Sequence, residues 1–380
     1  MSKIYKNIVI GGGASGLMFC ANLKSKKDTL LIEHNSKLGA KILISGGGRC
    51  NYTNIKVNAG DFLAKKKFVK SILHSFSNSY IDEYFKKRGL QSIVKNGREL
   101  FCKNSSKEIL DILLKEIKGI EVALNCKVLN VTKDRYFEVV TTKGNFKTKN
   151  LIIATGGLSF PKLGATSIGY DIAKHFGHNI ISLSPALVGF TLQPKEKFFK
   201  ELSGVSVDVN IKVAKKKFNG SLLFAHKGLS GPAILNASLF WKRGEIEIDF
   251  LPNFEIESIL NSNKSVSNLL PLPKRVALTF LNSFNIIDKR TNSLTYDEII
   301  RLKKIKSYKF APAGTFGYSK AEVTRGGIDT DEISSETLES KLVNNLYFLG
   351  EVLDVTGRLG GFNFTFAFAS ALKCARSGKF

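Results

Sequence analysis

Apolar and polar positions near the start of the chain alternate in the manner of an α/β protein. Residues 7–10 read Asn-Ile-Val-Ile, a β-branched run that leads directly into a glycine cluster at residues 11–16. Apolar residues then recur at helical spacing over residues 17–23, and residues 29–32 form a second apolar run. Short apolar runs bounded by turn residues are typical of buried strands, whereas recurrence every three to four residues is typical of a helix. The pattern therefore predicts strand, glycine turn, helix and strand in that order.

The glycine cluster matches a nucleotide-binding pattern. Glycines at 11, 13 and 16 fit G-x-G-x-x-G, in which the first permits a tight turn, the second lets the backbone approach a pyrophosphate, and the third lets helix and strand pack closely. The phosphates of such a ligand lie against the N–H groups at the helix N-terminus. Glu33 ends the second strand, where a carboxylate binds ribose hydroxyls and repels a 2′-phosphate. These residues predict a site for an adenine dinucleotide other than NADP.

A second glycine-rich stretch follows, reading Ser45-Gly46-Gly47-Gly48-Arg49-Cys50-Asn51. Three consecutive glycines are expected where backbone must approach something closely. We expect the N–H groups of this stretch and the Arg49 guanidinium to hold the pyrophosphate and the flavin edge of a bound FAD. The alternative is a plain turn.

Two later strands end in similar loops. The apolar run at residues 151–154 closes with Thr155-Gly156-Gly157, which resembles the second nucleotide-binding signature of FAD-dependent oxidoreductases. The run at residues 346–349 closes with Gly350-Glu351, where FAD proteins place an acid near the ribityl chain. The glycine turn at 360–361 then opens an apolar helix whose N-terminus is suited to stabilise an anionic reduced flavin.

Between the early and the late glycine-rich segments the pattern of apolar residues changes. Short β-like runs occupy residues 186–252, and two helices are predicted over 274–284 and 296–308, the second opening with a Thr295 cap. We expect a discontinuous FAD-binding domain of residues 1–185 and 321–380. Residues 186–320 then form an inserted substrate domain, with a β-barrel over about 186–252 and a helical part over about 253–320.

Composition limits the kinds of partner that the protein is expected to bind and the cellular compartment in which it is expected to lie. The formal net charge is +25, and such a basic balance suits a polyanion such as RNA, while Lys-, Asn- and Ile-rich AT-biased coding is the alternative explanation. A predicted helix at residues 64–76 carries lysines opposite an apolar face, which either contacts a polyanion or is simply solvated. The five cysteines show no C-x-x-C spacing, so reduced thiols, a cytoplasmic location and no metal site are expected. No apolar run is long enough to span a bilayer, and no signal peptide is readable.

The chain resembles the BaiN/RdsA family of bacterial flavoproteins. The matching segments cover nearly the whole chain and lie at residues 11–16, 44–54, 154–164, 223–233, 321–327, 337–341 and 350–363. The resemblance implies an α/β fold of the two-dinucleotide-binding FAD type, interrupted by a β-barrel with an attached helical part. It also implies an FAD-dependent, NAD(P)H-driven oxidoreductase. The sequence departs from the family pattern at Ser167-Ile168 and at Thr365-Phe366, which leaves the substrate assignment less certain than FAD.

The resemblance implies reduction of a C=C bond conjugated to a carbonyl. The expected reaction converts uridine to dihydrouridine in large-subunit ribosomal RNA, and the basic charge favours that substrate. One alternative is a small steroid-like enone or an amine, and another is a non-catalytic flavin-bound RNA-binding protein. A second G-x-G-x-x-G domain for NAD(P)H is absent from the sequence, so the donor must dock transiently. Nucleotide position, the choice of NADH or NADPH and the oligomeric state stay open.

The resemblance also assigns residues to the site. The expected cofactor-binding residues are Gly11, Gly13, Ala14, Ser15, Gly16, Glu33, Lys41, Ser45, Gly46, Arg49, Cys50, Asn51, Thr155, Gly156, Gly157, Gly350, Glu351, Asp354, Gly361, Phe362 and Asn363. Two candidates can supply the catalytic proton, Cys50 from the glycine-rich loop and His226 from the insert; the alternative for each is a structural role. Arg325 and Lys227 are expected to steer a phosphate or an enolate oxygen of the substrate.

Overall fold

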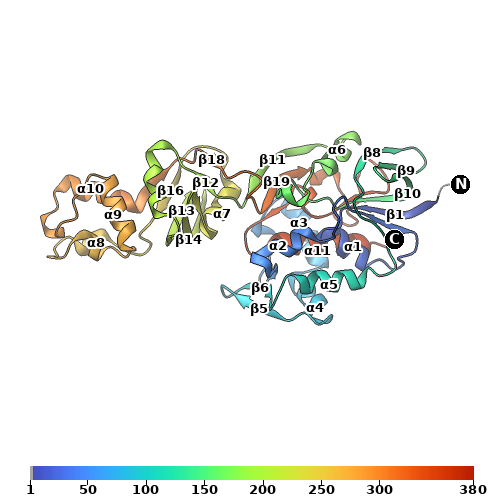
Figure 1. Cartoon of the computed structure of the whole chain (residues 1–380), viewed down its shortest axis with the longest axis horizontal. Helices are drawn as coiled ribbons and strands as arrows, with labels where there is room; N and C mark the ends of the chain where they lie inside the picture. The colour runs from blue at the N-terminus through green and yellow to red at the C-terminus, as the bar shows by residue number, and fades with distance from the viewer. Residues whose placement is uncertain (1–2) are drawn as a thin grey trace. The chain divides into compact units, whose positions relative to one another are not determined.

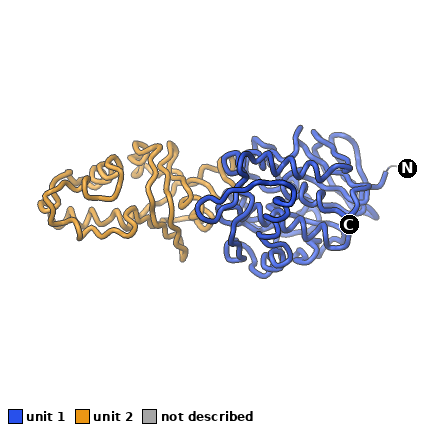
Figure 2. Tube along the Cα trace, turned by 90° about the horizontal axis from the view of Figure 1, so that it is seen from below, with its two compact units in different colours: residues 1–185, 323–380 blue, residues 186–322 orange. Residues whose placement is uncertain are grey.

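The computed structural model describes residues 3–380, which form two compact units (Figure 2). Unit 1 is the described part of Met1–Pro185 together with Val323–Phe380, and unit 2 is Ala186–Glu322. The chain therefore leaves unit 1 once and returns to it once. Among residues 3–380, no helix is both long and apolar enough to cross a membrane.

The core of unit 1 is a sheet with the strand order β7-β2-β1-β10-β9-β8, and β20 also pairs with β10 (Figure 1). The pairs β1–β2, β1–β10, β2–β7 and β10–β20 are parallel, whereas β9 pairs antiparallel with β10 and with β8. The strands are β1 (Ile4–Ile10), β2 (Thr29–Ile32), β7 (Glu121–Ala123), β8 (Val128–Lys133), β9 (Phe137–Thr141), β10 (Gly144–Ile153) and β20 (Leu346–Phe348). The predicted strands at 7–10 and 29–32 and the predicted Rossmann-type fold class are confirmed.

The register brings the loops of the sequence motifs to one edge of this sheet. Ile10 lies opposite both Ile32 and Ile153, and Ile153 lies opposite Phe348. The residues that follow these four strand ends are therefore neighbours, because the carboxyl ends of parallel strands meet at the same edge. Ligands of open α/β sheets bind outside that edge.

Helices cover the sheet of unit 1, and α11 packs against both α1 and α3 (Figure 1). The helices are α1 (Ala14–Ala21), α2 (Ala40–Gly48), α3 (Lys66–Ser75), α4 (Asn78–Lys86), α5 (Lys107–Glu116), α6 (Ile168–His175) and α11 (Phe362–Ala375). The helix predicted at 64–76 is confirmed, with its apolar side buried and Lys66, Lys67 and Lys70 exposed.

Short strands complete unit 1. They are β3 (Asn51–Asn54), β5 (Ser92–Lys95) and β6 (Glu99–Cys102) in one sheet, β4 (Phe62–Leu63) with β21 (Thr356–Gly357), and β11 (Ile180–Ala186) with β19 (Val323–Ile328). The β11–β19 pair places the departure of the chain from unit 1 beside its return.

Unit 2 is built on a second sheet with the order β17-β16-β13-β14-β15-β12-β18. Its strands are β12 (Phe190–Thr191), β13 (Ser206–Val213), β14 (Lys216–Ala225), β15 (Gly228–Ser230), β16 (Ile246–Asp249), β17 (Tyr308–Phe310) and β18 (Gly314–Thr315). Its helices are α7 (Pro232–Phe240), α8 (Val266–Leu269), α9 (Lys274–Ser283) and α10 (Tyr296–Lys303). Aromatic rings dominate its core, where Phe250 and Phe280 lie 4.8 Å apart edge to face.

Two details of unit 2 differ from the sequence expectation. The helix predicted over 296–308 ends at Lys303 and continues as a 3-10 turn, although its Thr295 capping box with Glu298 is present. The later strands β17 and β18 also return to the sheet after the helices, because their buried residues complete the same core.

Candidate functional site

The first glycine loop joins β1 to α1 and leaves open space before the helix. Gly11 has φ +107°, and a Cβ there would lie 2.4 Å from the Ala154 carbonyl oxygen. A Cβ on Gly16 would lie 1.9 Å from the Gly11 carbonyl oxygen, so both positions require glycine for close packing. A Cβ on Gly13, by contrast, would meet nothing within 4 Å. The N–H groups at the start of α1 therefore face a space that can admit phosphates.

Glu33 is held rigidly at the end of β2. Its Oε2 accepts from the Gly12 N–H at 2.8 Å, and its Oε1 accepts from the Asn35 N–H at 2.8 Å. The residue is buried, and each carboxylate oxygen keeps a further lone pair. This carboxylate is oriented before any ligand arrives, as a ribose-binding acid requires.

The second glycine loop interrupts α2 and reverses the chain. Ser45 is extended, Gly46 and Gly47 have φ of 56° and 65°, and the Cys50 N–H donates to the Ser45 carbonyl at 2.9 Å. Added Cβ atoms at Gly47 and Gly48 would meet nothing within 4 Å. The loop therefore exposes backbone to an open space, and Arg49 is exposed beside it without an ion pair in the described chain.

Cys50 lies on the inner side of this loop. Its thiol is fully buried, and burial together with the neighbouring Cys102 thiol raises the pKa of Cys50 well above its usual range. A buried thiol that holds its proton this firmly is inert. The geometry therefore favours the structural alternative for Cys50 over the role of proton donor.

Asn51 connects the second loop to the final helix. In the side-chain orientation that satisfies its neighbours, its amide nitrogen donates to the carbonyls of Thr53 and Leu100, and its oxygen accepts from the Gly361 N–H at 3.1 Å. The Thr53 and Thr365 hydroxyls are 2.8 Å apart and strengthen the same junction. Residues widely separated in sequence thus form one support for the loop.

The third loop carries Thr155, Gly156 and Gly157 away from β10. The Thr155 hydroxyl is buried and has no hydrogen-bond partner within the described chain. Gly156 has φ +72°, and a Cβ on Gly157 would lie 2.6 Å from the Thr324 hydroxyl. A Cβ on Gly169 of α6 would lie 2.1 Å from the Thr155 hydroxyl, so this hydroxyl faces the packed helix and not an open space.

Glu351 links the third loop to the return strand of unit 1. Its Oε1 accepts from the Thr324 N–H at 2.9 Å, and its Oε2 forms a 2.8 Å ion pair with Lys41. The Thr324 hydroxyl accepts from the Leu158 N–H at 2.8 Å. Lys41 and Glu351, both predicted cofactor residues, therefore neutralise each other at this edge.

The fourth loop begins at Gly350, and it touches the first loop. Gly350 has φ +70°, and a Cβ there would lie 2.0 Å from the Ser15 hydroxyl. The Asn363 side chain closes the turn before α11 by accepting from the Gly357 N–H at 2.8 Å and donating to the Gly357 carbonyl at 3.0 Å. Gly361 caps α11, and the Phe362 ring is buried against Phe62. Phe362 can thus offer a ligand its backbone N–H only.

Asp354 follows Glu351 in this loop and carries an unusual carboxyl. Its backbone N–H donates to the Ile328 carbonyl at 2.9 Å, and its side chain is partly buried. Burial and the nearby Asp329 raise the pKa of Asp354 to about 6, and Lys65 opposes the shift. The sequence predicted a cofactor contact here but contained no signal for a protonated carboxyl, because the charges come from distant segments.

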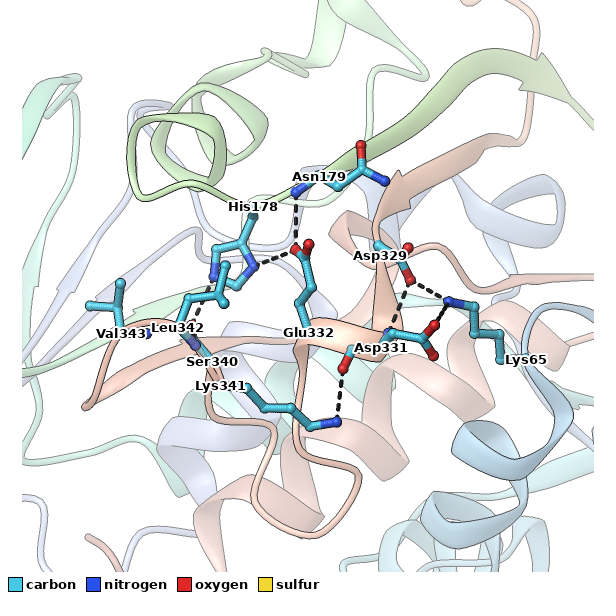
Figure 3. Close-up of polar contacts among 10 residues, drawn as sticks. All are labelled: Lys65, His178, Asn179, Asp329, Asp331, Glu332, Ser340, Lys341, Leu342 and Val343. Carbon is cyan, nitrogen blue, oxygen red and sulfur yellow. Dashed lines mark hydrogen bonds and ion pairs between the residues drawn. The ribbon is translucent and has the colours of Figure 1, made fainter.

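Lys65 and the Asp329 turn form a polar cluster (Figure 3), and both Lys65 and Asp329 influence the Asp354 carboxyl. The Lys65 ammonium contacts Asp329 and Asp331, each at 2.5 Å. The sequence left the lysines of this segment either solvated or in contact with a polyanion, whereas the Lys65 charge is neutralised by the return segment of the chain.

A buried histidine holds the same turn in place (Figure 3). His178 Nδ1 is 2.9 Å from Glu332 Oε2, and His178 Nε2 is 2.8 Å from Ser340 Oγ. Burial lowers the pKa of His178 despite its acidic neighbour. The backbone N–H of Asn179 also donates to Glu332 at 2.9 Å, so the cluster fixes the segment that presents Asp329. Sequence analysis missed His178, which has no local motif.

The predicted substrate residues divide between the units. Arg325 belongs to unit 1, where its Nε donates to the Ser184 hydroxyl at 2.9 Å. His226 and Lys227 belong to unit 2 and are exposed in the turn between β14 and β15. All predicted cofactor residues lie in unit 1, around the four loops.

The residues of unit 1 fit a dinucleotide. Four loops meet at the carboxyl edge of the parallel strands, two of them open onto space at glycine, and the Glu33 carboxylate is held beside the first loop. No group of three or more His, Cys, Asp or Glu side chains in residues 3–380 is arranged to hold a metal. The fold and the site therefore define a dinucleotide-binding protein of the Rossmann class.

The chain belongs to the HI0933-like family, whose Rossmann-domain model matches residues 5–377. It is 40% identical to the ribosomal RNA dihydrouridine synthase of Haemophilus influenzae, over 99% of both chains. The Escherichia coli protein of the same name is also 40% identical, over 97% of this chain and 96% of that one. The 3-dehydro-bile acid delta(4,6)-reductase of Clostridium scindens is 26% identical over 97% of this chain and 98% of its own. The family recognised from the sequence is confirmed.

Solved structures share the fold at low sequence identity. The 3-ketosteroid-delta4-(5alpha)-dehydrogenase of Rhodococcus jostii superposes with a TM-score of 0.52 at 10% identity, covering 99% of this chain and 98% of its own. The Escherichia coli quinol fumarate reductase subunit FrdA gives 0.52 at 12% identity, covering 100% of this chain and 70% of its own.

Proposed function

We propose that this protein is an FAD-dependent reductase that converts uridine to dihydrouridine in large-subunit ribosomal RNA. The observation that carries the proposal is 40% identity over nearly the full chain to two ribosomal RNA dihydrouridine synthases. In this proposal the four loops of unit 1 hold the FAD cofactor. NAD(P)H is the proposed donor, docking transiently, and the cytoplasm is the proposed location, in keeping with five free cysteines.

FAD would be held by unit 1 alone. Glu33 binds the adenosine ribose, the N-terminus of α1 receives the pyrophosphate, and the Ser45–Asn51 loop covers the flavin side. The N-terminus of α11, capped by Gly361, stabilises negative charge on the flavin pyrimidine. When bound and reduced, the flavin supplies hydride to the β carbon of a C=C bond conjugated to a carbonyl.

A proton must then reach the α carbon, and we consider two groups as its donor, Asp354 and His226. Asp354 in unit 1 has a pKa raised to about 6, so part of its population is protonated near neutral pH, as general acid catalysis favours. His226 in unit 2 is exposed and carries an imidazole, a common general acid. If Asp354 is the donor, turnover falls as the pH rises above about 6, and Asp354→Asn removes that dependence.

The direct test measures product and flavin together. NADH or NADPH should bleach the bound flavin, and ribosomal RNA fragments that contain the target uridine should restore its colour. Dihydrouridine should disappear from one position of the large-subunit RNA in a deletion strain and return with the wild-type gene. Bleaching without any dihydrouridine in RNA would contradict the proposal.

Reduction of a small enone is the second candidate. The 26% identity to a bile acid reductase over nearly the full chain favours it, because that substrate class uses the same hydride addition. A neutral enone has no phosphates, so its apparent affinity should be insensitive to salt, whereas RNA affinity should fall steeply with salt. Salt-insensitive enone turnover without dihydrouridine formation would establish this candidate instead.

A further inference from the structure

The hairpin that joins β13 to β14 in unit 2 carries a dense group of lysines. Lys212, Lys215, Lys216 and Lys217 are all exposed. Strand pairing places Lys212 directly opposite Lys217, and Val213 opposite Lys216. Four positive charges therefore lie within one turn and its two adjoining strand ends.

Neighbouring strands extend this positive surface. Glu247 of β16 lies beside Lys212, and Lys309 of β17 lies beside Glu247 in the same row across the sheet. Lys309 forms an ion pair with Glu247, so the only acid in the row already has a partner. The nearby Lys212 and Lys217 also help to lower the pKa of Glu247.

The loop before β16 adds further charge to the same end of the sheet. Lys242 and Arg243 are exposed there, with Glu245 as their only acidic neighbour in the loop. The Lys216 ammonium lies 5.8 Å from the centre of the Phe240 ring, which connects the hairpin to the end of α7. The lysine edge comprises Lys212, Lys215, Lys216, Lys217, Lys242 and Arg243.

Several lysines elsewhere in the described chain are paired with acids. Lys65, which precedes α3, is bound by two aspartates, and Lys289, Lys303 and Lys306 of unit 2 each have a glutamate partner. Within residues 3–380, none of the six residues of the lysine edge takes part in an ion pair of 4.0 Å or less. Unpaired cations concentrated at one exposed end of the strands repel one another, and a bound polyanion relieves that repulsion.

We propose that the lysine edge of unit 2 binds the phosphate backbone of the RNA substrate. The proposal rests on the proposed function and names the surface by which that substrate is held. Lysine ammonium groups contact phosphates as point charges without reading sequence, so the edge contributes affinity and orientation while the flavin site selects the uridine. The alternation of β13 suits this role, since its buried residues anchor the hairpin in the core of unit 2 and leave the lysines outside.

The test replaces the four hairpin lysines, Lys212, Lys215, Lys216 and Lys217, with glutamine. A matched variant replaces Lys107, Lys115, Lys118 and Lys127 of unit 1, which are also exposed and have no ion pair in the described chain. Affinity for a ribosomal RNA fragment is measured from 50 to 200 mM salt by fluorescence anisotropy. FAD content and bleaching by NAD(P)H are measured on the same preparations.

Each phosphate contact to single-stranded RNA contributes about −0.7 to the slope of log affinity against log salt. Loss of three contacts should flatten the slope by about 2 and weaken binding roughly 100-fold at 0.1 M salt. The matched variant should keep the wild-type slope, and both variants should keep wild-type FAD content and bleaching.

An unchanged slope in the hairpin variant, or equal flattening in both variants, would overturn the assignment of the surface. Wild-type protein that forms dihydrouridine while the hairpin variant binds RNA normally would refute the surface and leave the proposed function intact. Wild-type protein that forms no dihydrouridine would refute both. Loss of binding to vesicles of anionic lipid, with RNA binding unchanged, would identify a membrane surface in place of an RNA surface.

Discussion

The carboxyl of Asp354 provides a quantitative test of the site. Its pKa is raised from 3.8 to about 6 in the folded chain. An acid with a raised folded pKa binds more protons in the folded than in the unfolded state between those two values, so stability falls as the pH rises through them. The shift of about 2.2 units corresponds to at most about 3 kcal/mol at neutral pH, because solvent screening of this partly exposed carboxyl reduces the energy. Asp354→Asn keeps the shape and removes this penalty.

The measurable quantity is the stability difference between the variant and the wild type in the FAD-free protein. The linkage relation gives an increase of about 2 kcal/mol in favour of the variant between pH 4.5 and 7.5. For a domain of this size, that is a relative gain of about 4–8 °C in the melting temperature. Melting is followed by circular dichroism at matched ionic strength. Any pH-independent cost of burying the amide cancels in the comparison.

Asp329→Asn is the control of opposite sign. Burial acts to raise the pKa of Asp329, but hydrogen bonds from Asp331 and Lys65 outweigh it and lower the pKa. A lowered folded pKa stabilises the fold at pH values above the unfolded pKa, and this stabilisation is lost as the pH falls. Asp329→Asn should therefore reduce stability most at neutral pH and little in acid. A pH-independent difference for Asp354→Asn would show that the pKa of Asp354 is not raised by folding and would refute the reasoning.

The other predictions concern individual parts of the site. Glu33→Ala should weaken FAD binding by about one to two decades, because a charged hydrogen-bond partner is lost, and full flavin occupancy at unchanged affinity would contradict the first-loop assignment. Cys50→Ala should retain turnover within a few-fold; a 100-fold slower reoxidation with FAD still bound would restore the thiol as the acid. Joining residue 185 to residue 323 by a short linker should leave a chain that binds FAD but turns over no substrate, and native turnover would show that unit 2 is dispensable.

Local patterns predicted the parts of the fold that depend on neighbouring residues. The β-branched run before Gly11 and the capping residue Thr295 specify their elements through contacts within a few positions, and both predictions are confirmed. The end of the helix after Lys303 was wrong, because the strand that follows it is stabilised by pairing with β16, which no local pattern reveals.

The candidate site shows the same division. Glycine spacing and the position of Glu33 were readable because the chemistry lies within one strand-turn-helix unit. The neutralisation of Lys65 by Asp329 was not readable, because the two residues lie 264 positions apart. The raised pKa of Asp354 was not readable either, because burial and Asp329, which lies outside its own loop, cause it. The buried contact between the free thiols of Cys50 and Cys102 likewise depends on β3 lying beside β6.

The interrupted course of unit 1 has a consequence for synthesis on the ribosome. Strand β10 and helix α1 are made before unit 2, yet their partners β20 and α11 follow the whole of unit 2. At about 5–20 residues per second, the wait from Ala21 to Phe362 is roughly 17 to 70 seconds. Unit 2 has its own core and can fold during that interval, while the apolar face of α1 stays uncovered. The nascent first half of unit 1 is therefore a predicted client of the chaperones that attend translation.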